Sequence, residues 1–443
     1  MNQTYMKEKP VLPLLLSFSL PMMLSMLVSS LYNIIDSIFV AKMGEEAMTA
    51  ISLVYPMQNF ITSVAVGFGV GINAMIGMYL GANKKKEADV AASQGMMFSI
   101  IHGIIINLCG IVIMPHFLKL FTKNEAVINL GVKYSNIVLC FSIIIMIGIT
   151  FEKIFQAVGK MVISMISMIV GCVVNIILDP IMIFGLGPIP AMGIEGAAYA
   201  TGIGQAVTML IYIVMYFRNS INVKISFKYI KEKICIKLYT IGVPATLNMA
   251  LPSLLISALN GILVVFSPIY VVVLGIYYKL QTFIYMPANG IVQGMRPILS
   301  YNYGAKEYKR VRKIYKIALT LIAIMMTIGM ALCLIMPNVL VSMFTDNVET
   351  LKAGKVALRI ICMGFIVSSI SVTSCGALEA LGKGIESLVI SILRYVVIII
   401  PVAYILSRVY GATGMWNAFW ITEIIVSIVA WIIYSNVQKK NKC

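Results

Sequence analysis

The chain has 443 residues, of which 60% are hydrophobic and only 12% are charged. A soluble protein of this length needs far more charge on its surface, so the composition excludes that class. The 34 Lys and Arg residues exceed the 17 Asp and Glu residues, which gives a net charge of +17.

Apolar segments of twenty or more residues recur along the whole chain. Each is long enough to cross roughly 30 Å of hydrocarbon as a helix. The predicted spans are 13–40, 50–80, 92–117, 127–151, 161–185, 194–217, 238–264, 268–298, 314–338, 354–379, 385–408 and 414–435. We therefore predict an all-α integral membrane protein with twelve transmembrane helices in a lipid bilayer.

The positive charges gather on one side of these spans. If the N-terminus is cytoplasmic, the inward segments hold 23 of the 34 Lys and Arg residues. Because Lys and Arg favour cytoplasmic loops, we expect both termini in the cytoplasm of a cell with this protein in its inner or plasma membrane. The charge then reflects topology and contact with anionic lipids, and we expect no nucleic-acid partner.

The two halves of the chain repeat each other at an offset of 223 residues. The matched pairs include Pro21 and Pro244, Leu24 and Leu247, Tyr55 and Tyr278, Gln58 and Gln281, Gly67 and Gly290, Gly71 and Gly294, and Asn124 and Asn347. Each half has six spans, an even number, so both halves enter from the same side as a parallel repeat, which is typical of transporters. We predict an N-lobe at 1–217 (spans 1–6), a cytoplasmic basic linker at 218–237 and a C-lobe at 238–443 (spans 7–12).

Two of the acidic residues inside predicted spans stand out, because a charge is costly to insert there. Asp36 and Asp179 are expected at similar depth in the outer half of the N-lobe. One helical turn before each is another polar residue on the same face, Tyr32 and Asn175. We therefore predict a polar cluster, to which Tyr134 and Thr201 could add oxygen atoms.

The repeat places Leu259 and Val402 at the positions of these acids, so the pair occurs in one half only. Two nearby carboxylates in a medium of low dielectric cannot both stay ionised cheaply, so the pair could bind and release a proton. It could also coordinate Na⁺, and we expect no other metal and no cofactor. The structural alternative is a satisfied pair that locks helices together.

Prolines supply candidate hinges. Pro21 in the first span and Pro180 beside Asp179 each leave a backbone carbonyl without its helical partner. A helix weakened at such a point can bend when a nearby acid changes its charge. A fixed kink is the alternative for both.

Ionisable residues also occur in the C-terminal half. Lys279, Arg394 and Glu423 lie inside predicted spans, and a structural ion pair between Arg394 and Glu423 is the favoured interpretation, with a substrate-facing role as the alternative. Three further acids, Glu152, Glu379 and Glu386, lie near cytoplasmic helix ends, where we expect loop contacts.

Several motifs resemble those of the MATE (multidrug and toxic compound extrusion) family over essentially the full length of the chain. They are Tyr32-Asn-Ile-Ile-Asp36, Phe155-Gln-Ala-Val-Gly-Lys160, Asn175-Ile-Ile-Leu-Asp-Pro180 and the run from Gly193 to Thr201. The DinF-like branch is the more similar, because the acid that NorM-like members have in the seventh span is absent near Pro252.

The resemblance implies a monomeric secondary antiporter, not an enzyme, that exports cationic or amphiphilic drugs or metabolites while H⁺ or Na⁺ runs inward. The family's N-lobe cluster would fall on Tyr32, Asp36, Tyr134, Asn175 and Asp179, and its helix bend on Pro21.

Three rival functions stay open. A lipid-linked sugar flippase of the same superfamily usually has cationic residues in its cavity, and Lys279, Arg296 and Arg394 leave room for that function. A major-facilitator transporter usually has a different basic signature between spans two and three than Gly81-Ala-Asn-Lys-Lys-Lys86. A membrane enzyme or receptor would need longer loops.

Overall fold

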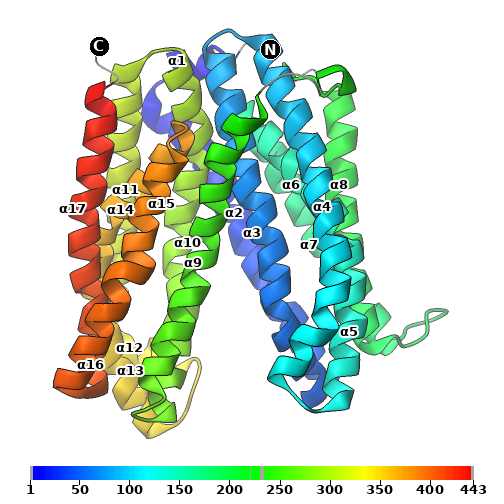
Figure 1. Ribbon diagram of the computed structural model, residues 1–443, viewed down its shortest axis with the longest axis vertical. Coiled ribbons are helices and arrows are strands. Elements are labelled where there is room, and N and C mark those ends of the chain that lie inside the picture. Colours follow the sequence, from blue (N-terminus) through cyan, green and yellow to red (C-terminus); the bar gives the residue numbers. More distant parts are fainter. Residues whose placement is uncertain (1–2, 220, 230–233, 441–443) are drawn as a thin grey trace. The chain divides into compact units, whose positions relative to one another are not determined.

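The computed structural model describes residues 3–219, 221–229 and 234–440. In these residues the regular structure is helical, apart from one isolated bridge between Leu186 and Ile189 (Figure 1). Within these described residues, eleven helical segments are long and apolar enough to cross a membrane, among them 348–380 (α13 to α14) and 384–415 (α15 to α16). The bent pair of α5 and α6, taken as one span, brings the number to twelve. The predicted all-α fold with twelve spans is therefore confirmed. Of the predicted linker, residues 220 and 230–233 lie outside the described residues.

The helices form two compact units. Unit 1 comprises residues 1–3 and 24–246, and unit 2 comprises residues 4–23 and 247–443. The chain changes unit inside two continuous helices, α2 (Val11–Ala41) and α9 (Cys235–Leu263). The predicted lobes follow chain order instead, and they stay a prediction.

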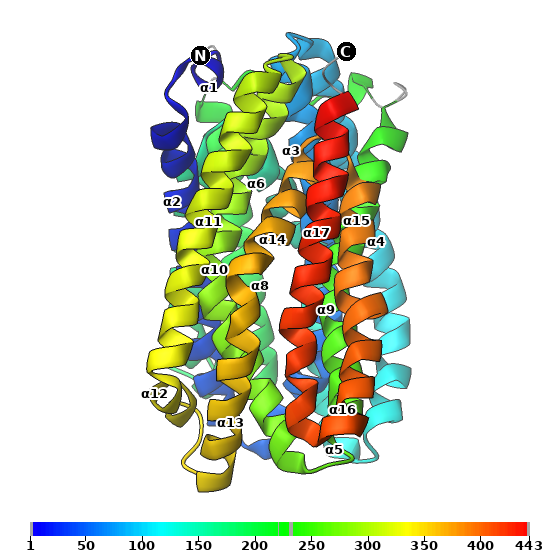
Figure 2. The same cartoon turned by 90° about the vertical axis from the view of Figure 1, so that its left-hand side faces the viewer.

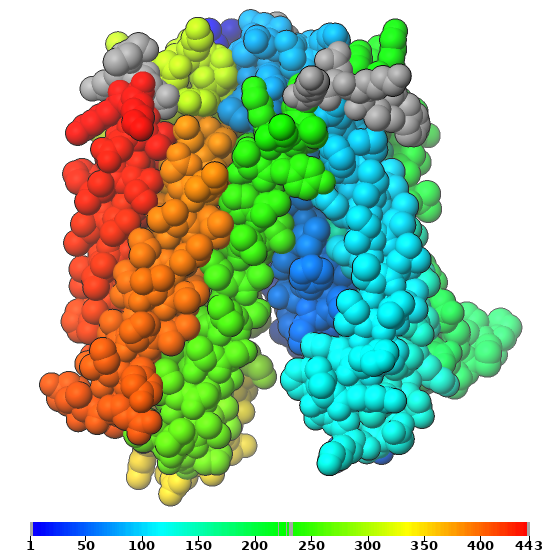
Figure 3. All heavy atoms as spheres, in the orientation of Figure 1, coloured from blue at the N-terminus to red at the C-terminus, as the bar shows by residue number. Residues whose placement is uncertain are grey.

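Unit 1 contains the larger part of α2 and the beginning of α9. Its other helices are α3 (Glu45–Gly81), α4 (Lys85–Phe121), α5 (Glu125–Cys140), α6 (Ser142–Ala157), α7 (Met161–Phe184), α8 (Gly193–Arg218) and the short η1 (Phe227–Tyr229). Met114, Leu118 and Leu139 are among the fully buried side chains that join α4 to α5 in its apolar core. The segment 185–192 between α7 and α8 stands out from this unit (Figure 3).

The fourth span is built from two helices because the chain bends by 44° between α5 and α6. The start of α5 is fixed by Asn124, whose side-chain oxygen accepts hydrogen bonds from the backbone nitrogens of Ala126 (2.9 Å) and Val127 (3.4 Å). Its repeat partner Asn347 caps α13 in the same way, at Thr350 (3.0 Å). Such caps satisfy donors that the first turn of a helix leaves free.

Unit 2 contains the beginning of α2 and the larger part of α9. Its other elements are α1 (Tyr5–Glu8), α10 (Pro268–Gly304), α11 (Tyr308–Ile335), α12 (Pro337–Ser342), α13 (Val348–Ile361), η2 (Cys362–Gly364), α14 (Phe365–Ala380), α15 (Gly384–Ile392), the π-helical η3 (Leu393–Ile398), α16 (Ile399–Met415) and α17 (Asn417–Lys440). Helix α17 packs against α14 and α16 (Figure 2).

Two glycines allow close packing of the helix segments that change unit, which are the beginning of α2 and the beginning of α9. A Cβ atom on Gly71 of α3 would lie 2.8 Å from the carbonyl oxygen of Leu238 in α9, and one on Gly294 of α10 would lie 2.7 Å from the backbone nitrogen of Ser19 in α2. Any side chain there would clash with backbone, so only glycine permits this approach. Gly71 and Gly294 are repeat partners, and each unit thus contains the same crossing of helices.

Candidate functional site

The two predicted acids meet inside unit 1. The side chain of Asp36 in α2 is hydrogen-bonded to that of Asp179 in α7. Asp179 is fully buried and Asp36 is half-buried. A carboxylate has no proton to donate, so a hydrogen bond between two carboxyl groups needs a proton on one of them. Two carboxyl groups in this arrangement can share one proton.

Asn175 lies one turn before Asp179 and connects the pair to α8. Its Nδ2 atom lies 3.5 Å from Asp179 Oδ1 and 3.4 Å from Thr201 Oγ1. The side chain of Tyr32, one turn before Asp36, is also hydrogen-bonded to Thr201. The i, i+4 spacing seen in the sequence thus brings both polar neighbours into the same cluster.

Tyr134 enters the cluster from α5. Its ring is buried, and its hydroxyl oxygen accepts a hydrogen bond from Gln58 Nε2 of α3 at 3.0 Å. Gln58 was not among the predicted site residues. Two signals could have identified it: a polar side chain in the middle of an apolar span, and its repetition as Gln281.

Three oxygen atoms of the cluster have no hydrogen-bond partner among the described residues. They are Asp36 Oδ1, Asp179 Oδ2 and Asn175 Oδ1, all of them buried. A buried acceptor without a donor is costly. Three acceptors together, two of them carboxyl oxygens, form a set suited to a proton or to Na⁺, which prefers oxygen ligands.

A cavity of about 390 Å³ lies beside this cluster within unit 1. Near the cluster it is lined by Tyr32, Gln58, Asn175 and Thr201. Its lining also includes Glu152, in the last part of α6. The predicted loop contact of Glu152 is wrong, because its side chain pairs with that of Lys153, with 2.7 Å between Oε1 and Nζ.

The two predicted hinge prolines lie inside continuous helices, Pro21 in α2 and Pro180 in α7. Pro21 lies three residues before Leu24, the first residue of α2 that belongs to unit 1. Its repeat partner Pro244 lies three residues before Leu247, where α9 enters unit 2. Their role as hinges stays a prediction.

In unit 2, Arg394 and Glu423 form a buried ion pair, with 2.5 Å between an Arg394 terminal nitrogen and Glu423 Oε1. Arg394 Nε also donates to this oxygen, at 2.7 Å. Lys279 does not join the pair; its Nζ atom lies 5.7 Å from the centre of the Phe344 ring.

Glu379 also differs from the expectation of a loop contact. It pairs with Arg296 of α10, with 2.5 Å between Oε2 and Nη2, and it accepts a hydrogen bond from Asn248 of α9. Glu386 makes a weak surface pair with Lys383, at 3.9 Å.

Curated relatives cover nearly the whole chain. The Multidrug export protein MepA of Staphylococcus haemolyticus (strain JCSC1435) is 26% identical over 435 residues, which are 97% of this chain and 95% of that protein. MepA of Staphylococcus aureus (strain MSSA476) is 26% identical over 432 residues, covering 97% and 94%.

Solved structures share the fold. A MATE structure in complex with MaL6 superimposes with a TM-score of 0.93 at 23% identity, over 100% of this chain and 99% of that one. A transporter of the MOP superfamily from Pyrococcus furiosus, whose description reports a binding pocket of reverse polarity and suggests a different function, gives the same TM-score, identity and coverage.

The profile of the MatE family matches the chain twice, at residues 21–181 and 244–405. The two matches begin 223 residues apart, at Pro21 and Pro244, which is the offset of the internal repeat. Together they cover most of the chain, and the chain therefore belongs to the MatE family of membrane transporters.

Proposed function

We propose that this protein is a secondary antiporter that exports cationic or amphiphilic compounds by alternating access in exchange for an inward flow of H⁺ or Na⁺. Asp36 and Asp179 would carry the coupling ion, with Asn175, Tyr32, Tyr134 and Thr201 as the surrounding oxygens. The observation on which this rests is the hydrogen-bonded acid pair with its unpartnered oxygen atoms.

Membership of the MatE family, together with the relatives named as multidrug export proteins, supports export as the direction of transport and drug-like compounds as the class of substrate. We further infer a DinF-like type of coupling, because the described acid pair lies in unit 1 and its repeat positions, Leu259 and Val402, are apolar. The positive charges of the loops support a cell-membrane location with both termini in the cytoplasm, and nothing in the proposal requires more than one copy of the chain.

Transport into or out of proteoliposomes tests this proposal. Purified protein is reconstituted, a fluorescent organic cation is supplied, and a pH gradient and a Na⁺ gradient are imposed separately. We expect one of the two gradients to drive movement of the cation against its own gradient. Absence of any movement under both gradients, with the protein correctly folded, would contradict the proposal.

The lipid-linked sugar flippase is less well supported, because the curated relatives are named as multidrug exporters. The same vesicles separate the two functions. A fluorescent polyprenyl-linked sugar that changes leaflet, while the organic cation does not move, would favour the flippase.

A further inference from the structure

Glu152 and Lys153 form an unusual ion pair at the edge of the cavity in unit 1. They are consecutive residues of α6, yet Lys153 Nζ lies 2.7 Å from Glu152 Oε1 and 3.2 Å from Gln156 Oε1. Gln156 Nε2 donates to the same Glu152 oxygen at 2.6 Å. Neighbouring side chains of a helix normally point about 100° apart, so Lys153 must turn back toward the glutamate.

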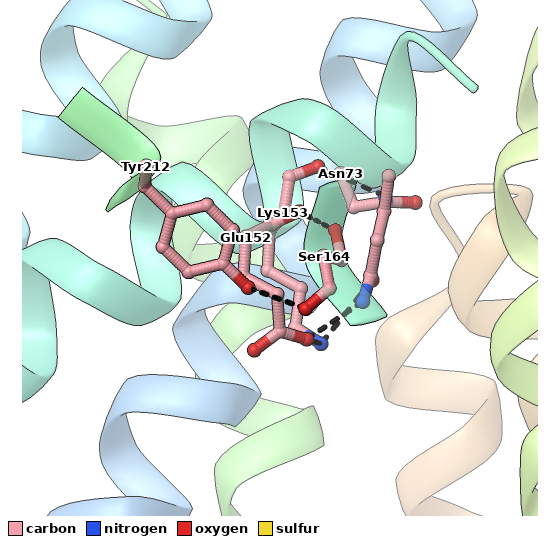
Figure 4. Close-up of polar contacts among 6 residues, drawn as sticks. Asn73, Glu152, Lys153, Ser164 and Tyr212 are labelled. Carbon is pink, nitrogen blue, oxygen red and sulfur yellow. Dashed lines mark hydrogen bonds and ion pairs between the residues drawn. The ribbon is translucent and has the colours of Figure 1, made fainter. Parts of the chain in front are cut away.

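The surroundings of the pair explain why it persists. The Lys153 side chain is only 4% exposed, while that of Glu152 is 21% exposed. An ammonium group buried this deeply needs a counter-ion, and Glu152 supplies it. The close-up shows both side chains converging next to Tyr212 of α8 and Ser164 of α7 (Figure 4). Tyr212 does not donate to Glu152, because its hydroxyl donates to the Ser164 carbonyl at 3.2 Å.

Glu152 differs from Lys153 in its access to the cavity. Glu152 belongs to the cavity lining and Lys153 does not. Among the described residues, the hydrogen bonds of the Glu152 side chain engage Oε1, which leaves Oε2 as the carboxyl oxygen for a ligand. The cavity lining also includes Gln205 and Thr208, which offer amide and hydroxyl groups, and Asn175, whose Oδ1 atom has no hydrogen-bond partner among the described residues.

We propose that Glu152 is a recognition site for organic cations, and that Lys153 is its built-in competitor. A substrate cation with N–H donors, such as a protonated amine or an amidinium, binds the carboxylate in place of the Lys153 ammonium. This inference rests on the proposed export of cations but concerns a different acid from the coupling pair.

When a substrate cation takes the place of the Lys153 ammonium, the Glu152 carboxylate keeps a positive partner and Lys153 keeps Gln156 Oε1 as an acceptor, at 3.2 Å. An uncharged ligand in that place would leave the carboxylate without a positive partner, which is costly. A quaternary cation has the charge but lacks the N–H groups that make a charge-assisted hydrogen bond. The site therefore favours hydrogen-bonding cations over neutral compounds and over cations without donors.

Equilibrium binding to purified protein, without any ion gradient, tests this site. The probes are DAPI, a fluorescent bis-amidine, and tetraphenylphosphonium, which has no N–H group. Replacement Glu152→Gln should weaken DAPI binding by about tenfold or more, since a charge-assisted hydrogen bond is lost, and should affect tetraphenylphosphonium less. Replacement Lys153→Gln should strengthen DAPI binding, because the competitor is removed.

The two replacements are expected to change DAPI binding in opposite directions, which distinguishes a role in binding from a role in stability. A role in stability alone would weaken binding in both variants, and that outcome, or unchanged DAPI binding in Glu152→Gln, would overturn the proposal. If Glu152→Gln does not fold, the proposal is tested by Lys153→Gln alone, from the change in DAPI affinity relative to tetraphenylphosphonium affinity. The matched control is Glu195→Gln with Lys133→Gln, a surface ion pair of the same unit at 3.2 Å, which should leave binding unchanged.

This binding experiment is independent of the transport experiment that tests ion coupling. Failure of the proposed antiport would appear as binding without gradient-driven movement in the parent protein. Failure of the Glu152 site would appear as intact transport with equal binding in all variants.

Discussion

The side chains of Asp36 in α2 and Asp179 in α7 are hydrogen-bonded to each other, although 143 positions of the chain separate them. Replacement of either by asparagine, Asp36→Asn or Asp179→Asn, removes the titratable pair and keeps the size of the side chain. We expect gradient-driven efflux to fall to background while the protein still inserts and elutes as a single species in size-exclusion chromatography. Efflux is measured in proteoliposomes, with Asp346→Asn, an exposed aspartate, as the control. Normal efflux in Asp36→Asn would remove the coupling role.

Thr201 links Tyr32 and Asn175 through one hydroxyl group. Thr201→Val keeps the shape and removes this group, so the Asn175 amide loses one acceptor and the acid pair loses part of its support. We expect the coupling-ion concentration for half-maximal efflux to rise several-fold and the free energy of unfolding to fall by about 1 kcal/mol. Thr282→Val, at an exposed position of α10, should change neither quantity; equal effects at both positions would show that the hydroxyl of Thr201 has no special role.

Gly294 permits the contact between α10 and the beginning of α2. Its replacement Gly294→Ala places a methyl group against the backbone of Ser19. We expect a loss of about 1–3 kcal/mol of stability, seen as a lower melting temperature of the purified protein. Gly275→Ala in the same helix has no heavy atom within 4 Å of the added methyl group, so it should be neutral or slightly stabilising. A neutral Gly294→Ala would argue against the close crossing.

The Arg394–Glu423 ion pair is buried in unit 2. Either single replacement, Arg394→Met or Glu423→Met, leaves an unpaired buried charge and should cost about 3–5 kcal/mol of stability. The double replacement removes both charges and should recover most of that loss. Thermal unfolding of the three variants measures the effect, with Lys383→Met and Glu386→Met as an exposed pair for comparison. Additive losses in the double variant would contradict a direct pairing.

Sequence patterns predicted the spans and the acid cluster for physical reasons. Apolar runs of twenty residues are typical of transmembrane helices. The i, i+4 spacing of Asn175 and Asp179 places both side chains on one face of a helix. No spacing in the sequence places α2 beside α7, but the high cost of isolated acids in a membrane favours the pairing of Asp36 with Asp179.

Other features gave no such signal. Glu152 and Lys153 are adjacent in a helix, where neighbouring side chains normally point away from each other. Their spacing in the sequence therefore does not predict the ion pair. Lys279 has a long side chain whose direction depends on the local packing, and it extends to Phe344 instead of toward Glu423. The change of unit at Leu24 and Leu247 occurs within unbroken helices. Pro21 and Pro244 lie three residues before these points, but a proline inside a helix does not by itself indicate a change of unit.

The exchange of helix segments between the units bears on how the protein is made. Ser19 leaves the ribosome early, but its glycine partner in α10 is synthesised only when two thirds of the chain is complete. Unit 1 likewise lacks the beginning of α9 until the second half of translation has begun. Neither half of the chain can complete its unit from its own six spans. We therefore expect a gene cut at the linker to yield two fragments that each need the other to fold.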